Sequence, residues 1–218
     1  MKRQGGPRPR EDGRHWLPSQ GVDPAPLAEL NAECLGQLVM RAAESENTAA
    51  APPLLTALHA QWAALPLHAV RRLSAAPFSL FDAGFASAPR WLELRARGVH
   101  ELPQRGELAY FEAPVARSIT RRMLVYGWHL ARSRPRAACL VFGSTIAAVE
   151  SLAACSLVAL EAAADRNADA LRPRWSNQFG FWRALLFAAS DGADRRLHEL
   201  LLGGVQRLAA ETLAAHDP

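Results

Sequence analysis

Apolar residues recur at intervals of three and four along most of the chain, which is the period of an amphipathic helix. A first helix is predicted after Asp23-Pro24, with its apolar residues at Leu30, Cys34, Leu35, Leu38 and Val39. A second begins at Pro53, and Pro66 breaks it before Leu67–Leu73 resumes the pattern. Trp91–Arg97 adds another helical stretch. The amino-terminal half is therefore predicted to be a series of short helices.

The carboxyl-terminal half is also predicted to be a series of short helices. Residues 139–152 predict two short helices that meet at Gly143, where glycine favours the end of one helix and Ser144 caps the next. Ser156 is predicted to cap a further helix, and a last helix spans about Ala193 to Ala214. Pieces this short are unstable alone, so they must bury their apolar faces against one another or against a second chain.

Prolines and glycines divide the chain into four parts. Residues 1–24 have no period and predict a disordered basic tail. Residues 25–97 form a helical amino-terminal unit, 98–114 a linker, and 115–218 a helical carboxyl-terminal unit. In the amino-terminal unit, Asp82 lies alone among apolar residues, and a cap on the turn at Gly84 is favoured over a general base.

The two units show related apolar patterns when one is shifted by ninety residues. Leu35 then lies over Val125, and Trp62 over Leu152. Two copies of one helical unit explain the agreement. The alternative is that any two amphipathic helical arrays can be slid into partial agreement.

Composition supports an all-α fold of many short helices. Half of the 218 residues are apolar, and much of that half is Ala and Leu, both strong helix formers. The chain is long enough to bury a working core in one domain or two. Ala137 to Leu160 is the one stretch that resembles a membrane span, and Glu150, the break at Gly143 and the alanine content argue against insertion.

The net charge of +4 is concentrated at the amino terminus. From Trp16 onward there are twenty basic and nineteen acidic residues, so the body is close to neutral. Because affinity for DNA grows with the number of phosphates neutralised, a neutral body predicts a weak solitary DNA binder. All basic residues except Lys2 are arginine.

Arginines nevertheless cluster locally. No acidic residue lies between Ala113 and Val149, and that stretch contains Arg117, Arg121, Arg122, Arg132, Arg134 and Arg136. On a helix beginning near Ser118 these are candidate phosphate contacts, with a solvated helix face as the alternative. Trp175, Phe179, Phe181 and Trp182 form an aromatic run that would either stack bases or pack in the core.

No catalytic or metal-binding motif is recognisable. His59, His68, His100 and His129 are scattered, without a metalloprotease motif or a nucleophile elbow. Cys34, Cys139 and Cys155 lie in apolar settings with no CxxC pair, which predicts reduced thiols in a cytoplasmic protein. The expectation is a non-enzymatic protein with no cofactor and no metal.

The carboxyl-terminal hundred residues resemble one family, the flagellar transcriptional activator FlhD, which is the partner subunit of a bacterial DNA-binding complex. The resemblance begins at Leu124-Val-Tyr-Gly-Trp-His-Leu-Ala-Arg and continues through Ala138-Cys-Leu-Val-Phe-Gly-Ser-Thr-Ile. It then passes Leu157-Val-Ala-Leu-Glu-Ala-Ala-Ala and Asn167, and ends in the helix around Leu197-His198.

The resemblance implies how the chain would assemble. The family unit pairs with a second copy of itself, so two units in tandem would form a pseudo-dimer within one chain. The cysteine that family members often use to link subunits aligns with Leu171, so that bridge is absent here. His198 matches a histidine in a helix associated with DNA and partner contact, which adds candidate contacts at Arg195, Arg196 and His198. A surface histidine with no role is the alternative. Arg174 is a further candidate contact.

The resulting expectation is a cytoplasmic subunit of a transcriptional activator, acting with a zinc-containing DNA-binding partner, with flagellar genes as the family's target and no membrane association. The alternative is a helical adaptor that binds another protein and never contacts DNA.

Overall fold

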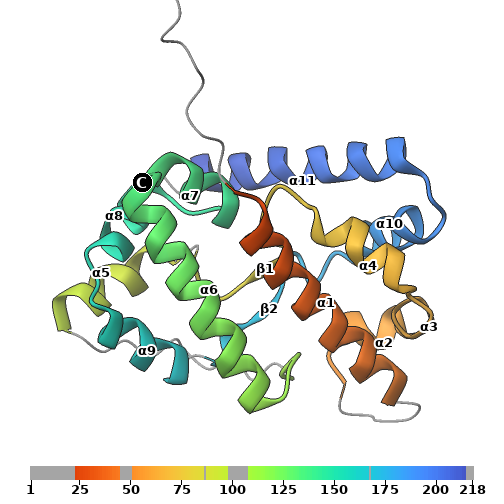
Figure 1. The fold of residues 1–218 in the computed structure, drawn as a ribbon, viewed down its shortest axis with the longest axis horizontal. Coiled ribbons are helices and arrows are strands. Elements are labelled where there is room, and N and C mark those ends of the chain that lie inside the picture. The colour runs from red at the N-terminus through yellow and green to blue at the C-terminus, as the bar shows by residue number, and fades with distance from the viewer. Residues whose placement is uncertain (1–22, 45–50, 86, 98–107, 167, 215–218) are drawn as a thin grey trace, which may run out of the picture.

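The computed structural model describes residues 23–44, 51–85, 87–97, 108–166 and 168–214, and within them the chain is all-α apart from one pair of very short strands (Figure 1). The amino-terminal half contains α1 (Ala25–Glu44), α2 (Pro53–Ala57), α3 (His59–Ala63), α4 (Leu67–Ser74), β1 (Phe81–Asp82) and α5 (Ala88–Arg97). The carboxyl-terminal half contains α6 (Ala113–Ser133), α7 (Pro135–Phe142), α8 (Ile146–Ala153), α9 (Leu157–Arg166), η1 (Ala168–Ala170), β2 (Arg172–Pro173), α10 (Phe179–Ser190) and α11 (Asp194–Ala214).

Several predictions concern residues outside this description. They are the basic tail up to residue 22, most of the predicted linker, His100 and Asn167. The end of that linker is described and differs from the expectation, because Tyr110 and Phe111 are buried in the core. Helix α6 begins at Ala113, not near Ser118, with Pro114 in its first turn, where a missing N–H costs nothing.

Local sequence signals account for most helix boundaries. Asp23 accepts a hydrogen bond from the backbone N–H of Ala25 at 3.0 Å and thereby starts α1. Pro66 separates α3 from α4 as predicted, whereas the division between α2 and α3 at Leu58 was not predicted. Leu58 has φ −124° and ψ 27°, and its side chain is fully buried, so core packing accompanies this kink.

The junction of α7 and α8 confirms the predicted turn but corrects its cap. Gly143 ends α7 in the left-handed conformation with φ 57°. The cap of α8 is Thr145, whose hydroxyl oxygen accepts from the N–H of Ala148 at 3.2 Å. Ser144 instead donates its hydroxyl proton to the carbonyl of Phe85 at 2.9 Å, across the molecule. Ser156 caps α9 as predicted.

Helices α7 and α8 are also the nearest approach to a membrane span in the described part of the chain. No single helix there is long and apolar enough to cross a bilayer, and α7 with α8 reach the required length only as a pair bent by 115°.

A pair of strands joins the two halves at the centre. β1 and β2 are antiparallel, with Phe81 opposite Pro173 and Asp82 opposite Arg172. The pairing is extended by the N–H of Arg174, which donates to the carbonyl of Leu80 at 2.8 Å. Asp82 caps the following turn, since its carboxylate accepts from the N–H of Phe85 at 3.0 Å, as predicted.

The same packing occurs in both halves. In the amino-terminal unit α1 packs against α3 and α4, and in the carboxyl-terminal unit α6 packs against α8 and α9. The helix that follows the strand in each half packs on the other half: α5 packs on α8, and α10 packs on α3 and α4. Trp182 of α10 thus lies 5.6 Å from Trp62 of α3, measured between ring centroids. The two units therefore share one hydrophobic core.

Element positions follow the same correspondence. Helix α5 begins at Ala88 and α10 at Phe179, 91 residues later, and β1 and β2 are separated by the same interval. This differs by one residue from the shift of ninety that the apolar pattern suggested. The interval places Trp91 over Trp182 and Gly36 over Gly127.

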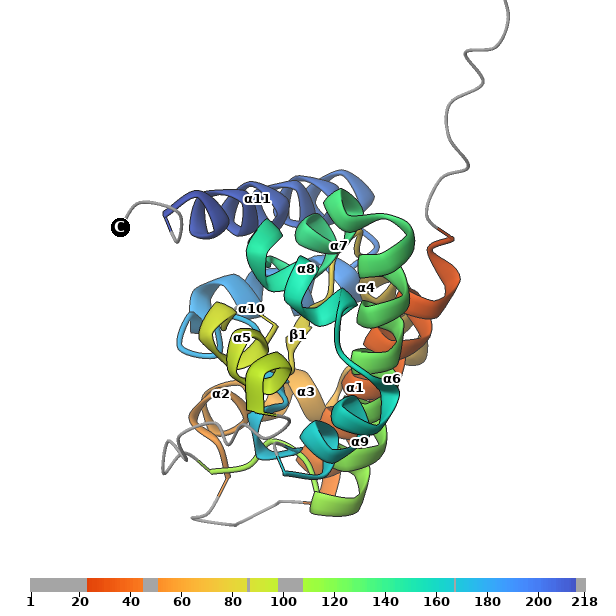
Figure 2. The same ribbon diagram turned by 90° about the vertical axis from the view of Figure 1, so that its left-hand side faces the viewer.

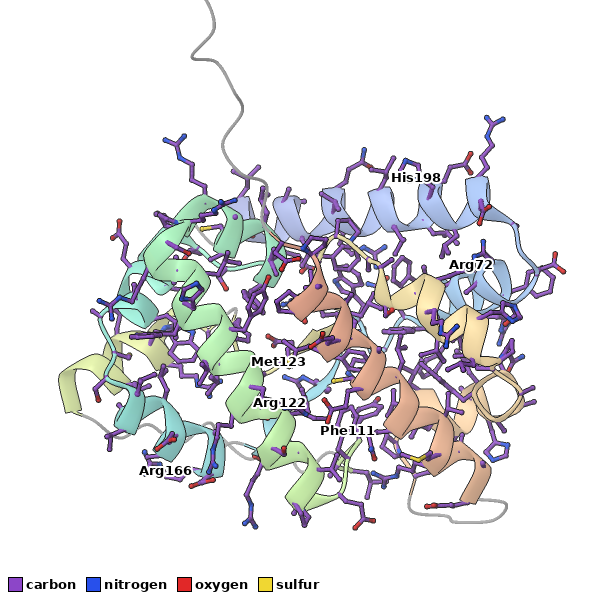
Figure 3. All side chains as sticks on the ribbon, in the orientation of Figure 1. Arg72, Phe111, Arg122, Met123, Arg166 and His198 are labelled. Carbon is purple, nitrogen blue, oxygen red and sulfur yellow. The ribbon has the colours of Figure 1, made fainter. Side chains whose placement is uncertain are left out.

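Helix α11 follows α10 and runs across the top of the molecule (Figure 2). Gly204 allows the ring of Phe78 to approach its backbone closely, and the side chain of Leu208 packs on Gly143. Arg72 of α4 donates to the carbonyl of Ala189 in α10 and to Asp194 at the start of α11, both at 2.5 Å (Figure 3). Helix α11 therefore contacts residues of both units.

Candidate functional site

Arg174 was predicted to contact DNA or a partner, and the structure contradicts this. Its side chain is buried between the two units, where Nε donates to the carbonyl of Ser79 at 2.8 Å and Nη2 to that of Phe142 at 2.6 Å. Asp82 lies 3.7 Å away. Burial lowers the pKa of this guanidinium, while the charge of Asp82 opposes that shift. Arg174 is a structural cation.

Two of the arginines on α6 are paired with carboxylates from other helices. Arg121 lies 3.3 Å from Asp165 of α9. Arg122 forms an ion pair with Glu33 of α1, and Figure 3 shows its side chain on the side of α6 that faces α1. Both pairs are about half exposed, so they add little stability, but they reduce the positive charge that α6 offers to a phosphate.

The remaining arginines of this stretch lie near the two ends of α6. Arg117 is exposed on the first turns, whereas Arg132, Arg134 and Arg136 gather where α6 meets α7. With a rise of ~1.5 Å per residue, Arg117 and Arg132 are separated by roughly 22 Å along the helix. None of these four arginines forms an ion pair with a carboxylate among the described residues.

One of the arginines at the junction of α6 and α7 is held in place by an aromatic ring. The guanidinium of Arg132 lies 4.6 Å from the centroid of Trp128, a favourable cation–π distance. Trp128 is fixed in turn, because its indole N–H donates to the carbonyl of Cys155 at 2.9 Å. Arg134 is half-buried at the start of α7 and Arg136 is exposed.

The candidate residues of α11 form a separate group. Arg195 and Arg196 both reach Glu199, at 3.2 and 3.4 Å, along the exposed side of the helix. His198 is exposed and points away from the molecule (Figure 3). This end of α11 lies beside α10 and α4, whereas the opposite end of α11 meets α7 (Figure 1). The predicted contacts thus do not form one continuous basic surface.

Residues of the aromatic run pack in the core or against α11. Trp182 is fully buried, and its indole N–H donates to the carbonyl of Arg174 at 2.7 Å. Trp175 and Phe181 lie edge to face at 5.1 Å between centroids, under the guanidinium of Arg207. Trp175 also donates to Glu211 at 2.7 Å. The choice between base stacking and packing is therefore decided in favour of packing.

Sequence reasoning missed a second buried arginine. Arg90 is fully buried, and its Nη1 donates to the carbonyl of Ala83 while Nε and Nη2 have no hydrogen-bond partner. Its guanidinium lies 4.5 Å from the centroid of Trp91. Burial lowers the pKa of Arg90 to about 10. Pro89 and Trp91 flank it in the sequence, and neither signals that the charge is buried.

The thiols and carboxylates do not cluster as metal ligands in the described part of the chain. Cys34, Cys139 and Cys155 form no disulfide, and burial raises the pKa of Cys34 and Cys139 above the ordinary thiol value. No group of three His, Cys, Asp or Glu side chains there could hold a metal ion.

No family model, curated protein or solved structure matches this chain. The resemblance to the flagellar activator subunit therefore rests on the residues of the chain itself.

Proposed function

We propose that this chain is a cytoplasmic regulatory subunit of the flagellar activator type, built as a fused pair of helical units, which acts on transcription through a DNA-binding partner. One observation supports this above all: α1 contacts α3 and α4 as α6 contacts α8 and α9, and α5 and α10 each pack on the other unit. A unit that normally pairs with its own copy would adopt such an arrangement when duplicated in tandem.

The distribution of charge explains why a partner is needed. Arg121, Arg122, Arg195 and Arg196 are paired with carboxylates, and Arg174 is buried. Of the candidate arginines, Arg117, Arg132, Arg134 and Arg136 are left, and a few phosphate contacts correspond to binding no tighter than ~100 μM at physiological salt. Sequence-specific binding to a promoter would therefore come from the second protein.

Co-purification at low salt tests the proposal. The tagged chain is expected to bring down a zinc-containing DNA-binding subunit, and the two together should shift a promoter fragment that neither shifts alone. A matched control is the same chain with Leu208→Asp, which should disturb the packing of α11 over Gly143 and reduce recovery. Recovery of a partner without any DNA-binding activity would contradict the transcriptional role.

The fused pair makes a separate prediction about mass. Because both halves of the dimer would be present in one chain, light scattering should give a monomer close to 23.7 kDa. A stable dimer of twice that mass would show that the two units do not replace the subunits of a pair.

A second candidate is a helical adaptor that binds protein only. The ion pairs on α6 and α11 favour it, because they reduce the positive charge of four of the nine arginines that were candidates for phosphate contact. In the same co-purification, a secretion component or an enzyme in place of the DNA-binding subunit would identify the adaptor.

A further inference from the structure

The two units differ most in the charge of their first helices. Helix α1 contains three glutamates and one arginine, whereas α6 contains four arginines and no acidic residue. Glu33 of α1 and Asp165 of α9 each neutralise one arginine of α6. The unneutralised charge is densest at the junction of α6 and α7, where Arg132, Arg134 and Arg136 lie within five residues.

The backbone adds to this positive corner. Helix α7 has no side-chain cap, and its first backbone hydrogen bond runs from the N–H of Ala138 to the carbonyl of Arg134 at 3.0 Å. Pro135 has no N–H, so those of Arg136 and Ala137 have no acceptor within the helix. Guanidinium groups beside free N–H groups suit the oxyanions of a carboxylate or a phosphate.

Part of the corner is already ordered. Arg132 rests on the ring of Trp128, and Trp128 is tied to the carbonyl of Cys155. Holding this side chain before binding reduces the conformational entropy lost when an anion arrives.

An exposed apolar side chain at the same place favours the carboxylates of a protein over the phosphates of a nucleic acid as the ligand. Leu140 lies one turn beyond Arg136 on α7, so both occupy one face, and 60% of its surface is exposed. A phosphate group has no apolar part that could cover the Leu140 side chain, whereas a peptide can supply an apolar side chain. The other unpaired arginine of α6, Arg117, lies roughly 22 Å from Arg132, which leaves no dense track of cations along the helix for a duplex.

We propose that the corner formed by Arg132, Arg134, Arg136 and Leu140 is a docking site for an acidic segment of a partner protein, whose carboxylates meet the arginines and whose apolar side chain covers Leu140. The inference rests on the proposed function in that it assigns a place for the partner. It also assigns one such site to each chain, because the equivalent end of α1 bears Glu44, not a cluster of arginines.

Selection of peptides tests this proposal without knowledge of the partner. A phage library of random twelve-residue peptides is selected on the full chain at low salt, and the enriched peptides are synthesised and titrated by fluorescence anisotropy. They should be acidic and contain an apolar residue. Arg132→Gln with Arg136→Gln should weaken binding about fivefold to tenfold, since exposed ion pairs are worth about two- to fivefold each.

Two further variants complete the design. Leu140→Ser should weaken peptide binding about fivefold through lost apolar burial. Arg117→Gln with Arg195→Gln removes the same charge elsewhere on the surface and should leave the affinity unchanged. Circular dichroism checks that each variant retains its helices, and all these side chains are on the surface.

Several outcomes would overturn the proposal. These are an absence of enriched peptides, enrichment of neutral or basic ones, or equal binding by the corner variant and the control. A twenty-base-pair duplex that binds more tightly, loses affinity with Arg132 and Arg136 and ignores Leu140→Ser would show that the corner takes phosphate. If acidic peptides bind here while the recovered partner does not bind DNA, the docking site stands and the transcriptional role falls.

Discussion

Corresponding helices of the amino-terminal and carboxyl-terminal units make similar contacts, but the charges on their surfaces differ. In both, a long first helix packs against short ones, and the helix after the strand, which bears a buried tryptophan, Trp91 or Trp182, packs on the other unit. Outside, α1 is acidic and α6 is basic. The comparison teaches that apolar spacing and a few buried polar contacts, such as those of Arg174, accompany this arrangement, while the exposed charges differ between the two units.

The largest expected effect distinguishes the two buried arginines. Arg174→Met should lower the free energy of unfolding by about 3–5 kcal/mol, because it leaves the carbonyls of Ser79 and Phe142 unpaired and Asp82 without its cation. Urea denaturation followed by circular dichroism measures the change.

Arg90→Met is the matched control for that measurement. Arg90 has one hydrogen bond and two unpartnered nitrogen atoms, so an apolar side chain of similar length should be neutral or raise stability by about 1 kcal/mol. Equal losses in both variants would mean that Arg90 has partners equivalent to those of Arg174.

An equivalent pair of glycines should respond in opposite directions. A methyl group at Gly127 would lie 2.6 Å from Cε1 of Phe85, whose ring is stacked on Phe142 at 4.1 Å between centroids and has little room to move. Gly127→Ala should therefore cost about 1–3 kcal/mol of stability, which thermal unfolding would report.

Gly36→Ala, at the corresponding place in α1, should have the reverse effect. No atom lies within 4 Å of the added methyl group, so the gain in helix propensity of about 1 kcal/mol is not opposed. If both alanines stabilise the protein, α6 can move away from Phe85 and the contact between the units is looser than the distances indicate.

The smallest effect concerns the thiols. Cys139 is half-buried, whereas Cys34 and Cys155 are buried, so iodoacetamide should modify Cys139 first and the other two only on unfolding. Because burial raises the pKa of Cys139, its alkylation rate should increase as the pH rises beyond the ordinary thiol value. Mass spectrometry of timed samples identifies the modified site, and early modification of Cys34 would indicate that α1 opens.

Boundaries set by neighbouring residues were predictable. Pro66, Gly143, Ser156 and Asp82 act within a few residues of themselves, through a missing donor, a left-handed conformation or a local cap, and all four were located from the sequence. Ser144 was not, since its hydroxyl bonds to the carbonyl of Phe85, which is distant in the sequence. Local rules cannot choose between a cap and a long-range acceptor.

The candidate site was harder to predict for the same reason. Arg117, Arg132 and Arg136 are exposed, as expected of arginines. Arg174 and Arg90 are buried in the structure, and their neighbours in the sequence do not indicate this. The carboxylates that neutralise Arg121 and Arg122 come from α9 and α1. The composition gives the number of charges, but it does not show which of them form ion pairs.

The sequence by itself determined that this protein is helical, where most of its helices start and stop, and that its body has little net charge, because these follow from spacing, local turn chemistry and counting. Only the tertiary structure decided that α5 packs on α8 and α10 on α3 and α4, and that Arg174 joins the two units. It also decided that unpaired positive charge remains where α6 meets α7. Those outcomes depend on contacts between residues far apart in the chain, whose energies exist only once the core has formed.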